Sequence, residues 1–329
     1  MYPTAGPARD RFVLDRRGPR TPPDAWRYQN LIVEDERTAE GPIARVATVF
    51  LTGRECPWRC VMCDLWRYTT PADTPAGAIP AQIAAARRAL EHERDGITLM
   101  KLYNAGSFFD PRAVPEGDYV DIAGQLAGLA RVVVESHPAL IGARVDRFLE
   151  ALHRRRVASG VPVQLEIAMG LETASPDALE RLHKQMTVDE FVAAAEALKS
   201  RGVALRTFLL VSPPFVRPDE QDAWLLHSID VAFSCGAALV SLVPTRSGNG
   251  AMEAVAADGD FRAPRLEDIE RSLELALARH RHRGRIFVDL WDLERFARCP
   301  HCFEARRRRL HAMNLEQSPL PRHSCAHCG

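Results

Sequence analysis

The sequence predicts an α/β protein that forms a full or partial (β/α) barrel, with a small four-cysteine tail at its C-terminus. Apolar runs rich in β-branched residues recur along the 329 residues, and alanine-rich stretches with the helical period separate them. Strands that are apolar throughout are typical of parallel sheets covered by helices. About seven such units in one chain favour a barrel, and two C-x2-C pairs near the end favour a separate metal site.

The expected elements alternate in order along the chain. The expected strands are ARVATVFL (44–51), ITLMKLY (97–103), RVVVES (131–136), VPVQLEIAMG (161–170), VALRTFLLV (203–211), AALVSLV (237–243) and RIFVDLW (285–291). Helices are expected near 80–94, 117–130, 144–158, 187–200, 219–235 and 265–282. Thr187 and Glu190 fit a capping box at the start of one of them. These elements predict three parts of the chain: an irregular extension over 1–40, a barrel over 41–294 and the cysteine tail over 295–329.

Composition narrows the class of protein further. The net charge is zero, and no apolar run approaches the length of a membrane span. The N-terminus lacks the apolar core of a signal peptide, so clustered cysteines are interpreted as metal ligands in a reducing cytoplasm. Arginines outnumber lysines by 40 to three and concentrate at both ends of the chain. This skew suits a polyanionic partner, and it is equally typical of codon bias in a GC-rich genome.

Three cysteines on one loop are the most informative motif. Cys56, Cys60 and Cys63 form a C-x3-C-x2-C pattern directly after the strand expected at 44–51. The carboxyl ends of barrel strands carry active sites, and three thiolates on a [4Fe–4S] cluster leave one iron open to another ligand. The alternatives are three buried thiols, or a zinc site completed by His92 or Asp64.

This motif in this context resembles the radical S-adenosylmethionine (radical SAM) superfamily. The resemblance implies a [4Fe–4S] cluster on the three cysteines, with SAM on the open iron. It also implies an external electron donor of the flavodoxin or ferredoxin type, and cleavage of SAM to a 5′-deoxyadenosyl radical.

Further positions resemble SAM-contacting segments of that superfamily. Met62 precedes the third cysteine, where an aromatic residue often covers the adenine. The turn NAGSFFD (104–110) offers backbone at Ala105, Gly106 and Ser107. Its Asp110 is either a contact or a turn residue. The remaining candidates are Glu135 in VVVESHPALI, Glu172 in MGLETASPDALERLHKQMT, and Arg246, whose segment is equally well interpreted as a rigid turn.

The tail carries Cys299, Cys302, Cys325 and Cys328 as two C-x2-C pairs separated by 22 residues. Four thiolates suit a structural zinc site or a second [4Fe–4S] cluster. Arg306, Arg307, Arg308 and Arg309 lie between the pairs and form either a solvated helix face or a nucleic-acid contact.

Taken together, these segments most resemble the radical SAM subunit family of archaeosine synthase, within the elongator- and methylthiotransferase-like class. That resemblance implies a lyase that modifies a tRNA nucleobase, with a partner transferase. The alternatives are a radical SAM enzyme for a small metabolite, a peptide or DNA, and a non-catalytic iron–sulfur or metal-binding protein.

Overall fold

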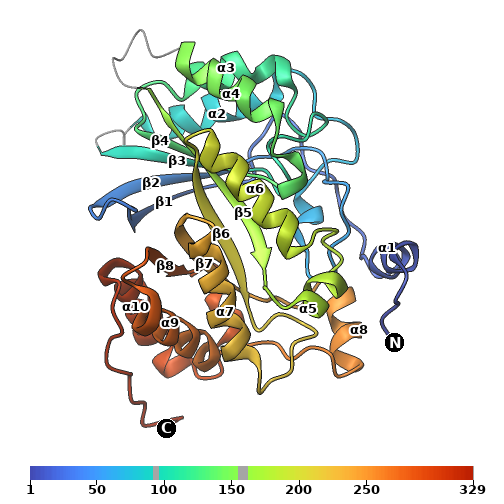
Figure 1. The fold of residues 1–329 in the computed structure, drawn as a ribbon, viewed down its shortest axis with the longest axis vertical. Helices are drawn as coiled ribbons and strands as arrows, with labels where there is room; N and C mark the ends of the chain where they lie inside the picture. Colours follow the sequence, from blue (N-terminus) through green and yellow to red (C-terminus); the bar gives the residue numbers. More distant parts are fainter. Residues whose placement is uncertain (92–95, 155–161, 329) are drawn as a thin grey trace.

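A single eight-stranded sheet organises the chain (Figure 1). The computed structural model describes residues 1–91, 96–154 and 162–328. The strands lie in sequence order, and the sheet is parallel from β2 to β8. No ladder joins the first strand to the last in the described part of the chain, so the sheet forms a partial barrel. The predicted α/β class is confirmed, in its partial form.

The strands match the expected ones closely, with one addition at the N-terminal side. Their bounds are β1 (Asn30–Arg37), β2 (Ile43–Phe50), β3 (Ile97–Tyr103), β4 (Arg131–Glu135), β5 (Gln164–Glu172), β6 (Ala204–Val211), β7 (Ala237–Pro244) and β8 (Arg285–Val288).

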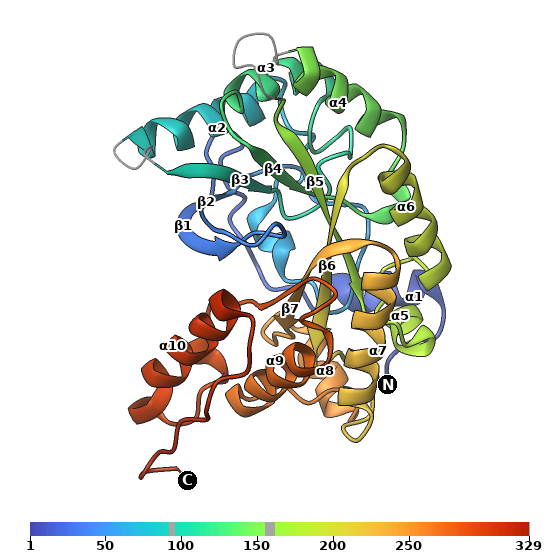
Figure 2. The same ribbon diagram turned by 60° about the vertical axis from the view of Figure 1, so that its left-hand side comes forward.

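Helices follow most of the strands and cover the outer face of the sheet (Figures 1 and 2). Those expected near 80–94 and 144–158 are confirmed within the described residues; positions 92–94 and 155–158 lie outside them. The capping box at Thr187 is present, since its hydroxyl accepts from Glu190 N and the Glu190 side chain accepts from Thr187 N. The helix bounds are α1 (Gly6–Leu14), α2 (Ala78–Ala89), α3 (Tyr119–Gln125), α4 (Ala143–Arg154), α5 (Pro176–Arg181), α6 (Val188–Ser200), α7 (Gln221–Ser234), α8 (Ala251–Ala257), α9 (Leu266–His280) and α10 (Pro300–Glu316).

The expectation of an irregular segment over 1–40 is wrong. Helix α1 lies there, and β1 pairs antiparallel with β2 as a hairpin. Strand β1 has the sequence NLIVEDER. Its three acidic residues interrupt the apolar run by which the other strands were predicted, so β1 was not expected. Two of those acids are accommodated because they face buried cations across the cavity side of the sheet: Glu36 pairs with Lys101 of β3 and Arg206 of β6, and Glu34 pairs with Lys101.

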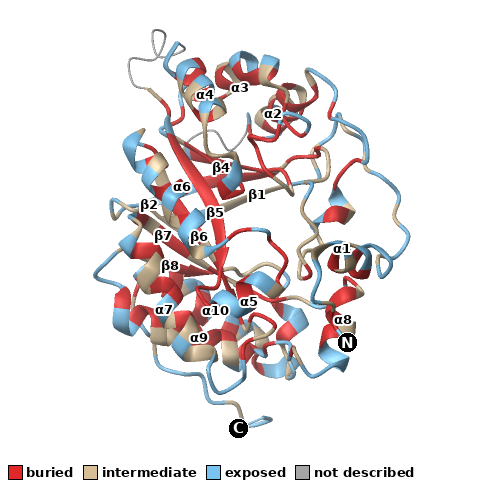
Figure 3. Cartoon of the chain, turned by 45° about the vertical axis from the view of Figure 1, so that its right-hand side comes forward, coloured by how far each residue is buried: buried red, intermediate tan, exposed pale blue. Residues whose placement is uncertain are grey.

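The two faces of the sheet differ in character. Met100 and Leu102 of β3 pack outward in the main apolar core beneath the helices. Leu99 and Tyr103 alternate with them and belong to a small separate cluster on the inner face. Figure 3 shows buried residues along the strands and on the helix faces turned to them. The inner face is therefore left free to line a cavity.

Candidate functional site

The cysteine loop leaves the carboxyl end of β2, the first of the parallel strands. Hydrogen bonds from loops distant in sequence help to hold it. Val61 N donates to Leu182 O at 3.0 Å, and the Asn249 amide donates to Val61 O at 2.8 Å and to Cys63 O at 3.2 Å. Loops that follow β5 and β7 thus position the cysteines, as the barrel argument predicts.

A cavity of about 730 Å³ opens on the inner face of the sheet at this end. It collects the three loop cysteines and nearly all the residues that the sequence singled out as contacts beside them. Its lining includes Cys56, Cys60, Cys63, Met62, Ala105, Gly106, Ser107, Glu135, Glu172 and Arg246.

Asp110 is the one candidate contact that lies outside this lining. It is buried, and its carboxylate accepts a hydrogen bond from Arg112 N at 2.9 Å. That contact is typical of a turn residue, which was the other interpretation of Asp110. Of the two residues that would complete a zinc site, Asp64 lines the cavity and His92 lies outside the described residues.

Close approach to Cys56 explains the glycine at 106. A Cβ on Gly106 would lie 3.3 Å from the Cys56 Cβ, so a side chain there would push the turn after β3 and the cysteine loop apart by a few tenths of an ångström. Burial raises the pKa of all three thiols, to about 12 for Cys60. These protons are lost when a thiolate ligates a metal.

The residues fit an iron–sulfur cluster with a bound ligand better than a single ion. Within the described ranges, only the C-terminal cysteines form a group compact enough for one ion. The triad is more widely spaced, which suits a larger group such as a cube of iron and sulfur. The Arg246 Nε is buried in the same cavity without a hydrogen-bond partner among the described residues. A bound ligand would supply that partner.

Two carboxylates, those of Glu135 and Glu172, face the cavity and differ in the groups that they contact. The Glu135 carboxylate accepts a hydrogen bond from Asn104 N at 3.2 Å. Burial, with a smaller effect of the Glu172 charge, raises the pKa of Glu135 to about 8. Glu172 is instead ion-paired with the buried Lys184 ammonium. A Cβ on Gly170 would collide with both members of that pair, which accounts for the glycine in the MGLE segment.

His137 and Trp58 are site residues that the sequence reasoning missed. The Trp58 indole lies in the cysteine loop and stacks on the His137 ring with centroids 3.7 Å apart and planes 13° apart. The His137 Nε2 lies 2.9 Å from Lys184 O, and its backbone N–H donates to Ser107 Oγ at 2.9 Å. Burial and the Lys184 charge lower the pKa of His137 to about 4, so a neutral ring holds three loops together. The sequence signal that could have identified His137 was its position two residues after Glu135 in ESHP.

Arg246 is fixed at the opposite wall of the cavity. Its guanidinium donates to Asp289 Oδ2 and to Trp291 O, both at 2.9 Å. Burial raises the pKa of Asp289, although the Arg246 charge acts in the other direction. The turn interpretation of this segment and the ligand-facing interpretation are compatible, because the paired guanidinium still lines the cavity.

A charged layer closes the floor of the cavity. Arg206 pairs with Glu36 at 2.7 Å and with Glu166 at 2.6 Å, and Lys101 pairs with Glu36. Arg206 and Lys101 hold the pKa of Glu36 at about 2 against the effect of burial. The mutual pairing of these groups satisfies charges that would otherwise be costly to bury.

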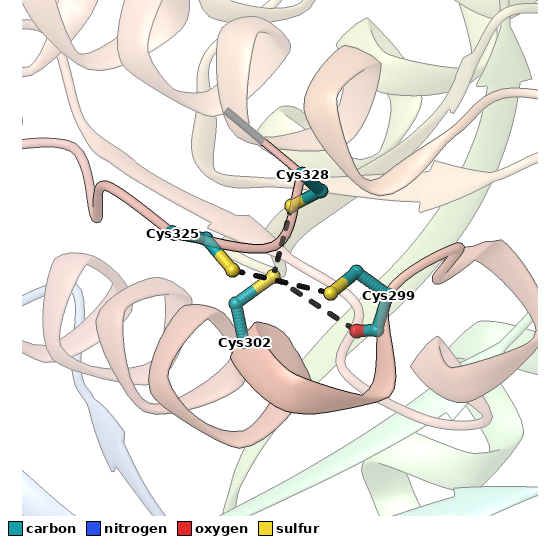
Figure 4. A group of neighbouring side chains, drawn as sticks. All are labelled: Cys299, Cys302, Cys325 and Cys328. Atoms are coloured by element: carbon teal, nitrogen blue, oxygen red, sulfur yellow. Dashed lines mark hydrogen bonds between the residues drawn. The ribbon is translucent and has the colours of Figure 1, made fainter.

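The C-terminal cysteines form a second site (Figure 4), and none of the four lines the cavity. The four Sγ atoms lie within 4.8 Å of one another. Cys299 and Cys302 lie at the start of α10, and Cys325 and Cys328 come from the segment that folds back on it. Four thiols at this spacing fit a single metal ion. The rings of His301 and His327 stack beside them at 4.0 Å.

The arginine run on α10 divides into two faces, which corrects its interpretation as one patch. Arg306 and Arg309 are buried and paired with acids of α9. Arg307 is exposed and pairs within its own helix with Glu304 at 2.9 Å. Only Arg307 and Arg308 remain on the solvent side, so the predicted nucleic-acid contact reduces to these two residues.

A partial barrel with a cysteine triad at the mouth of its cavity defines a radical SAM fold. Elp3 of Methanocaldococcus infernus has this fold in common with the chain, with a TM-score of 0.50, 12% identity, and coverage of 71% of this chain and 59% of its own. No protein-family model matches the sequence. No helix among the described residues is long and apolar enough to cross a membrane.

The chain is also a distant relative of archaeosine synthase subunit beta. The protein of that name from Methanosarcina acetivorans is 27% identical over 252 residues, which cover 73% of this chain and 69% of the relative. The one from Thermococcus kodakarensis is 30% identical over 164 residues, or 48% of this chain and 47% of the relative.

Proposed function

We propose that this chain is a radical SAM enzyme that modifies a nucleobase in tRNA, as the archaeosine synthase relatives suggest. The observation that carries the proposal is the shared cavity, where three cysteines meet seven of the eight candidate SAM contacts. When bound, the cluster supplies an electron to SAM, whose cleavage yields a 5′-deoxyadenosyl radical.

The side chains of the cavity would bind and orient the cluster and SAM. Cys56, Cys60 and Cys63 would hold the cluster. Glu135 and Glu172 face the region beside it and suit the ammonium group of SAM, whose charge would favour ionised Glu135. The walls of the cavity would limit the access of water to a reactive species.

The first experiment separates this proposal from a non-catalytic iron–sulfur protein. After anaerobic reconstitution and reduction, we expect the protein to convert SAM to 5′-deoxyadenosine, and Cys60→Ala to abolish it. Cys235→Ala is the matched control, since this cysteine ends α7 and does not line the cavity. Equal activity in both variants would refute the cysteine assignment.

Substrate and partners form the finer part of the proposal. We propose tRNA as substrate, a flavodoxin or ferredoxin as electron donor, and a separate transferase that prepares the base. Phosphate contacts make binding salt-dependent, by about 0.7 to 0.9 in log–log slope per contact. Arg307→Ala with Arg308→Ala should therefore flatten the salt dependence of tRNA binding.

A small-molecule substrate is the second candidate, and one observation favours it. The pairing of Arg306 and Arg309 with α9 removes half of the arginine run from solvent. Absence of salt-dependent tRNA binding in the parent protein, together with 5′-deoxyadenosine formation, would support this candidate over tRNA.

A further inference from the structure

Helix α10 lies along the seam between the two edges of the sheet. It contacts β1 on one side and β8 on the other, and Figure 2 shows it beside the end of the sheet that carries β7 and α9. Arg37 at the end of β1 donates to Leu315 O of α10. The helix therefore occupies the place where a closed barrel would have further strands.

Two amide side chains, of Asn314 in this helix and of its C-cap residue Gln317, form the hydrogen bonds that a further strand would form with β8. Asn314 Oδ1 accepts from Val288 N at 2.9 Å, and its Nδ2 donates to Val288 O at 2.9 Å. Gln317 forms the same pair of bonds with Ile286, both at 2.8 Å. Both backbone groups of two alternate β8 residues are thus satisfied by α10, as a neighbouring strand would satisfy them.

The same helix forms part of the cavity wall. His311 and Asn314 belong to the lining, as do Phe287 and Val288 of β8. On the β1 side the lining continues with Glu34 and other residues of that strand. A shift of α10 would open the cavity sideways between β1 and β8.

The other end of α10 is where the four-cysteine site lies. Cys299 is its N-cap residue and Cys302 lies in its first turn. Cys325 Sγ lies 3.9 Å from Cys299 Sγ, and Cys328 Sγ lies 3.7 Å from Cys302 Sγ. A metal held by these thiolates would cross-link the start of the helix to the segment that follows its end, and such cross-links contribute directly to folding.

We propose that the four-cysteine site positions the side wall of the active-site cavity: its metal anchors α10, and α10 through Asn314 and Gln317 closes the seam between β8 and β1. The tail is then a part of the catalytic chamber, not an independent finger. Calling the cavity a catalytic chamber rests on the proposed function, whereas the anchoring of α10 does not.

Backbone amide exchange tests the anchoring without any turnover. The Ile286 and Val288 N–H groups donate to Gln317 and Asn314, so their exchange reports whether α10 is docked. In the zinc-loaded protein of 329 residues we expect both amides to be protected. In the Cys325→Ser, Cys328→Ser double variant, with metal loss confirmed by elemental analysis, we expect exchange at least about tenfold faster.

The amide of Ile167 in β5 is the internal reference, because it lies in the centre of the sheet. Unchanged exchange at β8 after metal loss would overturn the proposal and leave the α9 ion pairs as the sufficient anchor. An equal rise at Ile167 would also overturn it, since the site would then support the fold as a whole.

A second variant keeps the proposal testable if the double variant fails to fold. Asn314→Leu removes both bonds to Val288 at similar size. We expect faster exchange of Val288 with metal content unchanged, whereas Arg307→Ala on the solvent face of α10 should alter neither. Retained protection of Val288 in Asn314→Leu would refute the role of the amide. Because these tests measure amide exchange and metal content, their results can be interpreted even if the protein does not cleave SAM.

Discussion

Replacement of Glu135 by glutamine tests the electrostatics of the cavity quantitatively. The pKa of this carboxyl is raised to about 8 from an ordinary value of 4.5, so the folded protein binds the proton more tightly than the unfolded chain. The stabilising contribution is full below about pH 4.5 and is lost as the pH rises toward about 8. At face value that separation corresponds to roughly 5 kcal/mol.

Water in the cavity reduces this figure. Glu135 is partly exposed by surface area and borders the cavity, so screening by solvent lowers the expected value to roughly 2 kcal/mol. The iron-free parent should therefore lose roughly 2 kcal/mol of unfolding free energy relative to Glu135→Gln between about pH 5 and about pH 8. Glutamine keeps an acceptor for Asn104 N while it removes the charge.

Urea unfolding at the two pH values measures the difference, and comparison within each pH cancels other titrating groups. Glu150→Gln is the matched control, because Glu150 is exposed on α4 and pairs with Arg154 on the same helix. A difference in unfolding free energy between parent and Glu135→Gln that stays the same at both pH values would refute the raised pKa of the Glu135 carboxyl.

Three further predictions concern the same cavity. Gly106→Ala should lower the iron content after reconstitution, because the added Cβ crowds Cys56 by a contact that costs about 1–3 kcal/mol; normal iron loading would contradict this. Glu172→Gln should destabilise the protein by about 3–5 kcal/mol in thermal or urea unfolding, because it leaves the Lys184 ammonium buried and unpaired; a loss below about 1 kcal/mol would show that the pair is solvated. Asp110→Asn should leave 5′-deoxyadenosine formation unchanged, since the side chain caps a turn outside the cavity; loss of activity in a folded variant would restore it as a contact.

The sequence was most informative where a local pattern carries a chemical requirement. The spacing of Cys56, Cys60 and Cys63 and the alternation of apolar runs with helical stretches both depend on neighbours along the chain, and both led to the radical SAM fold. The strand ends then followed, because parallel strands bring their carboxyl ends to one edge. That is why most of the candidate SAM contacts line one cavity.

The features that were missed depend on partners distant in sequence. The acids of β1 are unsuited to a strand that lines a cavity unless cations such as Lys101 and Arg206 face them, and nothing local in the sequence reveals that pairing. The arginine run looked like one basic patch because Glu270, which neutralises Arg306 and Arg309, lies on another helix. The stacking of His137 on Trp58 likewise joins two loops whose proximity only the fold creates.

The amide pairs of α10 have a consequence for how this protein behaves in concentrated solution. An exposed strand edge offers unpaired N–H and C=O groups on which a strand of another molecule can add. Asn314 and Gln317 occupy those groups on β8. Truncation before α10 would therefore yield a molecule prone to self-association through its sheet, and a shortened expression product would be lost to aggregation before its chemistry could be measured.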